Sequence, residues 1–166
     1  MVGQEPVLPI PIPSQLAANC SKTAERAAWL RRLPSTLRDL ERRWSISLGP
    51  PIDWAEVSCA WVAPVECADG ATAILKLAMP HMEGAHEIQG LRFWDGHPTV
   101  RLLEADDDVG AMLLERCEPG TSLGALPEAE QDVVIARLLN RLWRSPRSPS
   151  LQVLFRGAAP ASDTSQ

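Results

Sequence analysis

The stretch ATAILKLAMP, Ala71–Pro80, places a lysine within an apolar run, although only two of the 16 basic residues in this chain are lysines. Because successive side chains of an extended strand point to opposite faces, Ile74 and Lys76 would share one face. Leu75 and Leu77 would lie on the other. An ammonium group that points inward needs an anion as partner, whereas a lysine at a strand edge can reach water without one. The stretch predicts a β-strand and leaves both roles open for its lysine.

Two glutamates in the segment after this strand could supply that anion. Glu83 and Glu87 are four residues apart within Pro80–Asp95, whose spacing predicts a helix ended by Gly96. Residues four apart lie on the same helix face. A helix carboxylate that held Lys76 would leave donors of the ammonium group for a nucleotide phosphate. This is the lysine and glutamate arrangement of a kinase small lobe.

The sequence around this strand predicts the order helix, β-hairpin, helix, β-hairpin. The first hairpin occupies 60–80 and turns at Ala68–Gly70, because Asp-Gly between apolar runs favours a hairpin turn. The second joins strands over Val100–Ala105 and Ala111–Cys117. The aspartates between them, Asp106–Asp108, are interpreted as a turn cap in water and not as a metal site.

Helical spacing and composition define the rest of the chain. Ala24–Ser45 has apolar residues at helical spacing, interrupted or restarted at Pro34. Pro127–Trp143 predicts a final helix. We expect three parts: a proline-rich mobile N-terminus over 1–23, a folded domain with flanking helices over 24–144, and a disordered tail over 145–166.

Composition argues against several classes of protein. The formal charge of -5 disfavours a nucleic-acid or anionic-membrane partner held by a basic surface. No apolar run approaches the roughly 18 to 20 residues of a membrane span, and the N-terminus lacks a signal-peptide pattern, so we expect a cytoplasmic protein. The four cysteines lack CxxC spacing, and His81 and His86 miss the spacing of helical zinc ligands. We therefore expect reduced thiols and no metal site.

Four segments, taken in order, resemble one family of proteins. They are WVAPVECADGATAILKL (Trp61–Leu77), HEIQGLRFWDG (His86–Gly96), TVRLLEADDDVGAMLLERCEPG (Thr99–Gly120) and ARLLNRLW (Ala136–Trp143). Together they are similar to the N-terminal part of the aminoglycoside/hydroxyurea antibiotic resistance kinases, of the streptomycin 6-kinase type, over about 33–143. The resemblance implies an α+β fold, a protein-kinase-like small lobe. It would have an antiparallel sheet of about four to five strands, a helix of the αC type and preceding N-terminal helices, without the catalytic large lobe.

The resemblance also implies a site for ATP, bound as Mg-ATP. Lys76 would contact the α- and β-phosphates and counter the charge that shifts during phosphoryl transfer. Glu87 would be its partner on the helix, in preference to Glu83. The nucleotide would then be the partner that this chain itself recognises.

Two further parts of that site follow from the same resemblance. The linker after the last strand would offer backbone N–H and C=O groups to the adenine edge, at Glu115, Arg116 and Cys117. Ser58 belongs to the loop Ser58–Trp61, which would cover the phosphates. That loop contains no glycine, so the glycine-rich phosphate loop of protein kinases is absent from it.

The sequence departs from the family in its catalytic residues. A kinase needs an HxDxxxxN-type loop, whose aspartate acts on the acceptor hydroxyl, and Asn and Asp ligands for Mg²⁺. None of His81, His86 and His97 is followed by aspartate at the second position. We therefore expect a chain without catalytic residues or metal ligands, inactive alone. A truncated gene, a frameshift and a deliberately shortened chain would each produce it.

Three functional hypotheses stay open. The first is the small lobe of an ATP-dependent phosphotransferase with an alcohol group as acceptor, serving antibiotic resistance. It would meet the antibiotic only if a large lobe were supplied. The second is a non-enzymatic nucleotide- or protein-binding module, and the third is an unrelated α+β domain with a structural lysine. In a separated small lobe the face that should meet the large lobe is an apolar patch, so we expect self-association through that face.

Overall fold

The computed structural model describes residues 10–53, 59–80 and 86–143, and the chain divides into two compact units, Met1–Thr121 and Ser122–Gln166. The described part of the first unit contains α1 (Ser14–Cys20), α2 (Ala24–Trp44), β1 (Ile46–Leu48), β2 (Ala60–Cys67), β3 (Thr72–Ala78), α3 (Glu87–Trp94), β4 (Leu102–Asp106) and β5 (Ala111–Glu115). The second unit contains a short 3-10 helix, Leu123–Ala125, and α4 (Glu128–Leu142), which confirms the predicted final helix. Among these described helices, none is both long and apolar enough to cross a membrane.

The strands form one antiparallel sheet in the order β1-β2-β3-β5-β4. Both predicted hairpins are present. Gly70 has a φ of 81° in the β2–β3 turn, a conformation that suits glycine. In the second hairpin both strands are shorter than predicted, since β4 begins at Leu102 and β5 ends at Glu115. The sequence did not predict β1, because three residues are too few to show an alternation pattern.

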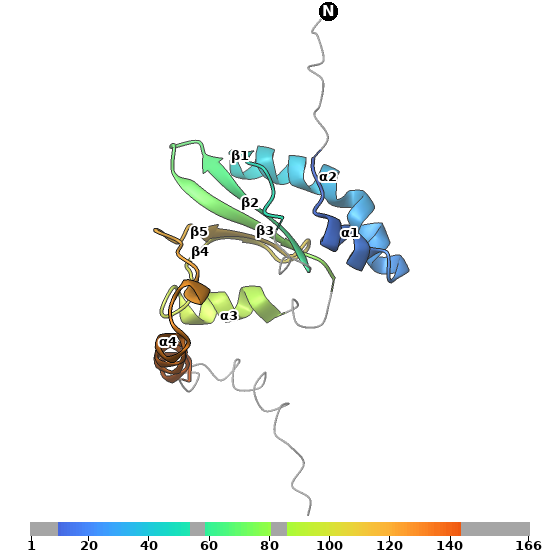
Figure 1. Cartoon of the computed structure of the whole chain (residues 1–166). Helices are drawn as coiled ribbons and strands as arrows, with labels where there is room; N and C mark the ends of the chain where they lie inside the picture. Colours follow the sequence, from blue (N-terminus) through green and yellow to red (C-terminus); the bar gives the residue numbers. More distant parts are fainter. Residues whose placement is uncertain (1–9, 54–58, 81–85, 144–166) are drawn as a thin grey trace, which may run out of the picture. The chain divides into compact units, whose positions relative to one another are not determined.

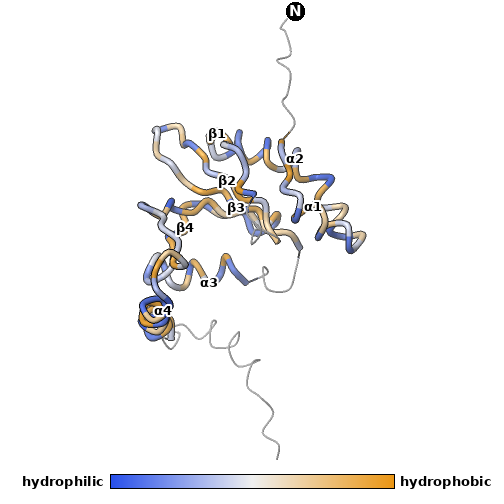
Figure 2. Tube along the Cα trace, viewed as in Figure 1, coloured by the Kyte–Doolittle hydropathy of each residue, from blue (hydrophilic) through white to orange (hydrophobic). Residues whose placement is uncertain are grey.

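One face of the sheet is closed by α1 and α2, and α3 lies on the other side (Figure 1). Ala73, Leu75 and Leu77 of β3 are at most 1% exposed. They belong to one hydrophobic cluster with four fully or almost fully buried leucines of α1 and α2: Leu16, Leu33, Leu37 and Leu40. Figure 2 shows hydrophobic residues along β2 and β3. This sheet with helices on both sides confirms the predicted α+β, kinase-like small-lobe fold.

The N-terminal segment differs from the sequence expectation of extended or mobile chain. Within 1–23 the structure has α1, and its Leu16 and Cys20 are completely buried. The Trp61 indole N–H donates to the Pro11 carbonyl oxygen at 3.1 Å, which ties this segment to β2. Pro13 caps α1, and proline is well tolerated where a helix begins. Burial against the sheet therefore gives the part of this segment that the structure describes, from residue 10 onward, a fixed place.

Helix α2 also differs from its prediction, because it runs without interruption through Pro34. An internal proline removes one helix hydrogen bond and costs about 3 kcal/mol. On the same helix Trp29, Leu33, Leu37 and Leu40 are buried in the core, and each such side chain contributes about 1.5 to 3 kcal/mol. One continuous buried face therefore outweighs the local cost of the proline.

Candidate functional site

Lys76 lies on the face of β3 that is opposite to the core. Its neighbours across the sheet are Val62 of β2 and Met112 of β5. The ammonium Nζ donates to Oε1 of Glu87, in the first turn of α3, and the two side chains are 28% and 32% exposed. The structure thus brings together two of the residues that the sequence singled out. An ammonium group has three N–H donors, so one bond to Glu87 leaves capacity for two more.

Local sequence explains where α3 ends and which side faces the sheet. Ile88 is 6% exposed and is the buried residue of this helix. Asp95, with a φ of 46°, and Gly96, with a φ of 74°, end the helix as predicted. Glu83, the alternative partner for Lys76, lies outside the described residues.

The linker residues begin with Glu115, the last residue of β5, at the far end of the strand from its turn with β4. Glu115 is engaged with Arg101: its Oε1 accepts the Arg101 N–H at 2.7 Å, and its own N–H donates to the Arg101 carbonyl at 3.0 Å. Arg116 and Cys117 are exposed. Among the described residues, no backbone hydrogen bond outside the helices and strands involves either of them.

The face of the sheet opposite to the core is called the open face below. Between Lys76 and the linker it carries a half-buried apolar strip. Strand pairing places Pro64, Ile74 and Leu114 side by side, one step along the strands from Lys76 towards the linker. A strand rises about 3.3 Å per residue, so the four steps from Met112, beside Lys76, to Arg116 span about 13 Å. The face therefore offers a cation at one end and apolar surface in the middle, and it leads to the exposed residues Arg116 and Cys117 at the other end.

The loop assigned to phosphates stays untested, because Ser58 lies outside the described residues. Cys59, the first described residue after the gap, is exposed, and its carbonyl accepts the Met79 N–H at 2.9 Å. No three His, Cys, Asp or Glu side chains in the described part of the chain are grouped so that they could hold a metal ion.

The three aspartates of the β4–β5 turn have distinct contacts. Asp106 caps the turn by accepting the Asp108 N–H at 3.1 Å, and it pairs with Arg43 of α2 at 2.6 Å. Asp107 binds Arg92 of α3 through both carboxylate oxygens, at 2.8 and 2.7 Å. These hydrogen bonds hold the pKa of the Asp107 carboxyl below its usual range. No sequence pattern indicated either ion pair, because each joins segments far apart in the chain.

Comparison with known proteins relates this arrangement to a family. The sequence profile described as Aminoglycoside/hydroxyurea antibiotic resistance kinase matches residues 43–159. The chain belongs to this family. The family match includes Lys76, Glu87 and the linker. It continues beyond Trp143, where the sequence predicted the resemblance to end.

Two curated members of this kinase family are the streptomycin 6-kinases of Streptomyces griseus and Streptomyces glaucescens. Each is 36% identical to the chain over 148 residues, which are 87% of this chain and 48% of the relative. Hydroxyurea phosphotransferase of Kitasatospora aureofaciens is 41% identical over 120 residues, 70% of this chain and 34% of that protein. The chain thus spans about half the length of the streptomycin kinases. No solved structure matches it.

Proposed function

We propose that this chain provides the nucleotide-binding part of an ATP-dependent kinase that phosphorylates an alcohol group of an antibiotic. The observation that carries the proposal is the ion pair between Lys76 and Glu87, which lies on the open face of the sheet and within the family match. A strand lysine paired with a helix glutamate is the arrangement with which kinases hold ATP phosphates.

The geometry of the open face suits Mg-ATP. Lys76 would donate to the α- and β-phosphates, and Glu87 would keep the ammonium group in position, which stabilises charge that moves during transfer. The apolar strip at Ile74 and Leu114 would lie against the purine ring. Backbone groups of the linker, at Glu115–Cys117, would meet the adenine edge. The span of about 13 Å along the strand is comparable to the length of an extended nucleotide.

Transfer itself needs groups that this chain does not carry. None of its three histidines begins an HxDxxxxN-type loop, and such a loop with its Mg²⁺ ligands supplies the catalytic aspartate of a kinase. We therefore propose that the chain binds nucleotide but transfers no phosphate alone. With a large lobe, the acceptor would be an alcohol group of an antibiotic such as streptomycin or the N-hydroxyl group of hydroxyurea, after the names of the relatives. We place this activity in the cytoplasm.

Thermal melting with Mg-ATP tests the proposal. The wild-type chain should melt at a higher temperature with nucleotide, because a ligand at 100 times its Kd stabilises the folded state by about 2.7 kcal/mol. In Lys76→Met the nucleotide should no longer raise the melting temperature. Lys22→Met is the matched control, since the other lysine is exposed and bonds Asn19 Oδ1 at 2.6 Å. In this control Mg-ATP should raise the melting temperature as in the wild-type chain.

Two other outcomes would redirect the assignment. No rise in any of the three proteins would sink the nucleotide proposal and favour a structural lysine or a protein-binding module. If the melting temperature of Lys76→Met still rises with Mg-ATP, the nucleotide binds at another part of the chain. Light scattering at tens of micromolar tests the proposed self-association through the face that would meet a large lobe, and a monomer at that concentration would contradict it.

A further inference from the structure

We propose that Arg92 and Asp107 form a positioning pair that holds α3 in the orientation in which Glu87 meets Lys76. The geometric part of this proposal stands on the described contacts alone. Its consequence for ATP rests on the proposed function. Neither residue is among those proposed to bind the nucleotide, so both would act through Glu87.

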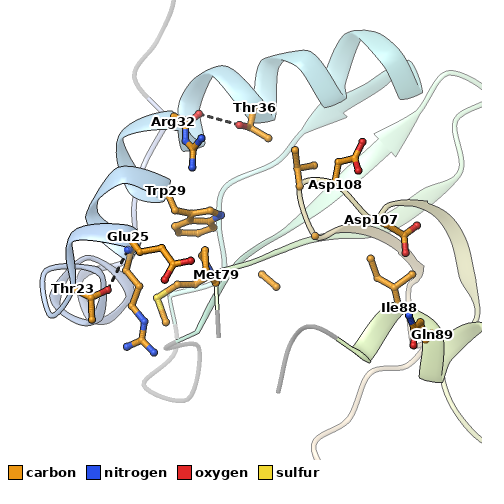
Figure 3. A pocket seen from close by; sticks show the side chains of 15 residues that line it. Thr23, Glu25, Trp29, Arg32, Thr36, Met79, Ile88, Gln89, Asp107 and Asp108 are labelled. Atoms are coloured by element: carbon orange, nitrogen blue, oxygen red, sulfur yellow. Dashed lines mark hydrogen bonds between the residues drawn. The ribbon is translucent and has the colours of Figure 1, made fainter. Parts of the chain in front are cut away.

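Apolar packing by itself does not fix the position of α3. Of its eight residues Ile88 is the one that is buried, whereas Leu91, Phe93 and Trp94 are half-buried. Beside it opens a cavity of about 1070 Å³, lined by residues of α2, α3 and the β4–β5 turn that include Ile88, Gln89, Trp29 and Asp108 (Figure 3). A helix with an open cavity on one side and one buried side chain can shift or rotate at little packing cost.

Two ion pairs within the described residues join α3 to the sheet and its turns. Glu87 pairs with Lys76 of β3, and Arg92 pairs with Asp107 of the β4–β5 turn. Glu87 and Arg92 are five residues apart, which corresponds to about 7.5 Å along the helix axis and about 140° around it. Two fixed points with that separation restrain both the translation and the rotation of the helix.

The Arg92–Asp107 contact is geometrically specific. Both guanidinium Nη atoms donate, one to each carboxylate oxygen, at 2.8 and 2.7 Å. This fork fixes the plane of the contact as well as its length. The two side chains are 49% and 54% exposed, so its role lies in orientation rather than in a large contribution to stability.

The turn that carries Asp107 is itself anchored on the opposite side. Asp106 accepts backbone N–H groups of Asp108 and Val109 and pairs with Arg43 of α2. The turn is thereby tied to the helix that closes the core. Asp107 then extends from a fixed support to α3. The neighbouring aspartates therefore have separate roles, one towards each helix.

Lysine NMR provides a readout at the site, because the chain has only two lysines. In a sample with ¹³C,¹⁵N-labelled lysine, the variant Lys22→Arg assigns the signals to Lys22 and Lys76. The variant Glu87→Gln then defines the chemical shifts that Lys76 has without its carboxylate partner. The variants Arg92→Gln and Asp107→Asn remove opposite charges. If the Lys76 signals move in the same direction in both variants, the cause is a changed position of α3 and not a change in the local electric field.

The expected result is that Lys76 signals in Arg92→Gln and Asp107→Asn move most of the way to their Glu87→Gln positions. The matched controls, Arg43→Gln and Asp106→Asn, break the pair on the other side of the turn and should leave those signals at the wild-type positions. The exchanged pair, Arg92→Asp with Asp107→Arg, should restore them. Circular dichroism checks that each variant keeps its helices. If a variant loses its helices, Arg92→Lys is used in its place, because lysine keeps the positive charge but cannot form the two parallel hydrogen bonds of the guanidinium group.

The proposal is overturned if the Lys76 signals stay at wild-type positions in both α3-side variants, or if the α2-side controls move them equally. This readout needs no nucleotide, so it is independent of the proposed function. In the melting experiment Arg92→Gln should weaken Mg-ATP binding several-fold while Arg43→Gln does not. If no variant and no wild-type protein binds Mg-ATP, the proposed function fails while the lysine signals still decide the positioning role.

Discussion

The two faces of the sheet are built from alternate residues of the same strands, yet they differ in burial. On the face covered by α1 and α2, Leu75 is completely buried and Leu77 is 1% exposed. On the face towards α3, Met112 is 1% exposed, but in β3 Ile74 is half-buried and the Lys76 side chain is 28% exposed. The closed face forms the core, whereas the open face keeps a charged group within reach of a ligand. The two-residue period of a strand therefore separates the residues of the core from the residues of the proposed nucleotide site.

The first prediction compares neighbouring strand positions and has the largest expected effect. Leu75→Ala should lower the free energy of unfolding by about 2 to 5 kcal/mol, because it leaves a cavity in a packed core. Ile74→Ala, on the open face, should cost only about 1 to 2 kcal/mol. Urea unfolding measures both. Equal losses would show that the two faces are packed alike and would remove the basis of the comparison.

The second prediction tests how the closed face holds the N-terminal segment. Trp61→Phe removes the N–H that donates to Pro11 and should cost about 1 to 2 kcal/mol through the lost hydrogen bond and volume. Trp143→Phe is the control, because Trp143 is 79% exposed and should change stability by less than about 0.5 kcal/mol. Limited proteolysis should then cleave the Trp61→Phe protein earlier near α1. An unchanged cleavage rate would contradict the anchoring role of Trp61.

The third prediction concerns the stability of the open face. Lys76→Met should change the free energy of unfolding by less than about 1 kcal/mol, because ion pairs between partly exposed groups contribute little. Chemical unfolding without nucleotide measures this value. A loss as large as that of Leu75→Ala would show that the Lys76–Glu87 pair is a structural part of the core, and it would weaken the proposed function.

The fourth and smallest effect is a pH dependence on the side of α3. Arg92 lowers the folded-state pKa of Asp107, so the stability that this carboxylate contributes is present above its unfolded pKa, about 4. It is lost as the pH falls through the depressed folded pKa. Wild type and Asp107→Asn should therefore differ in melting temperature at neutral pH and converge below that range. A difference that persists unchanged in strong acid would contradict the ion pair.

Sequence reasoning predicted those features that depend on neighbours in the chain. The β2–β3 hairpin, α3 with its end at Gly96 and α4 follow from alternation, turn residues and helical spacing. Lys76 stood out because an apolar strand rarely contains a charge. The family resemblance was confirmed, but the roles of the linker residues and of Ser58 stay predictions, since no contact of the chain tests them.

The sequence by itself determined the strand at Ala71–Pro80, its two faces and the family, because each depends on the identity and order of nearby residues. Only the tertiary structure decided that α1 is ordered, that α2 continues through Pro34 and that two adjacent aspartates serve different helices. The physical reason is that burial and ion pairing depend on partners distant in the chain: Trp61 and Pro11 are 50 residues apart, and Arg92 and Asp107 are 15 apart. Local propensity favours an element, but the free energy of long-range contacts decides where it lies.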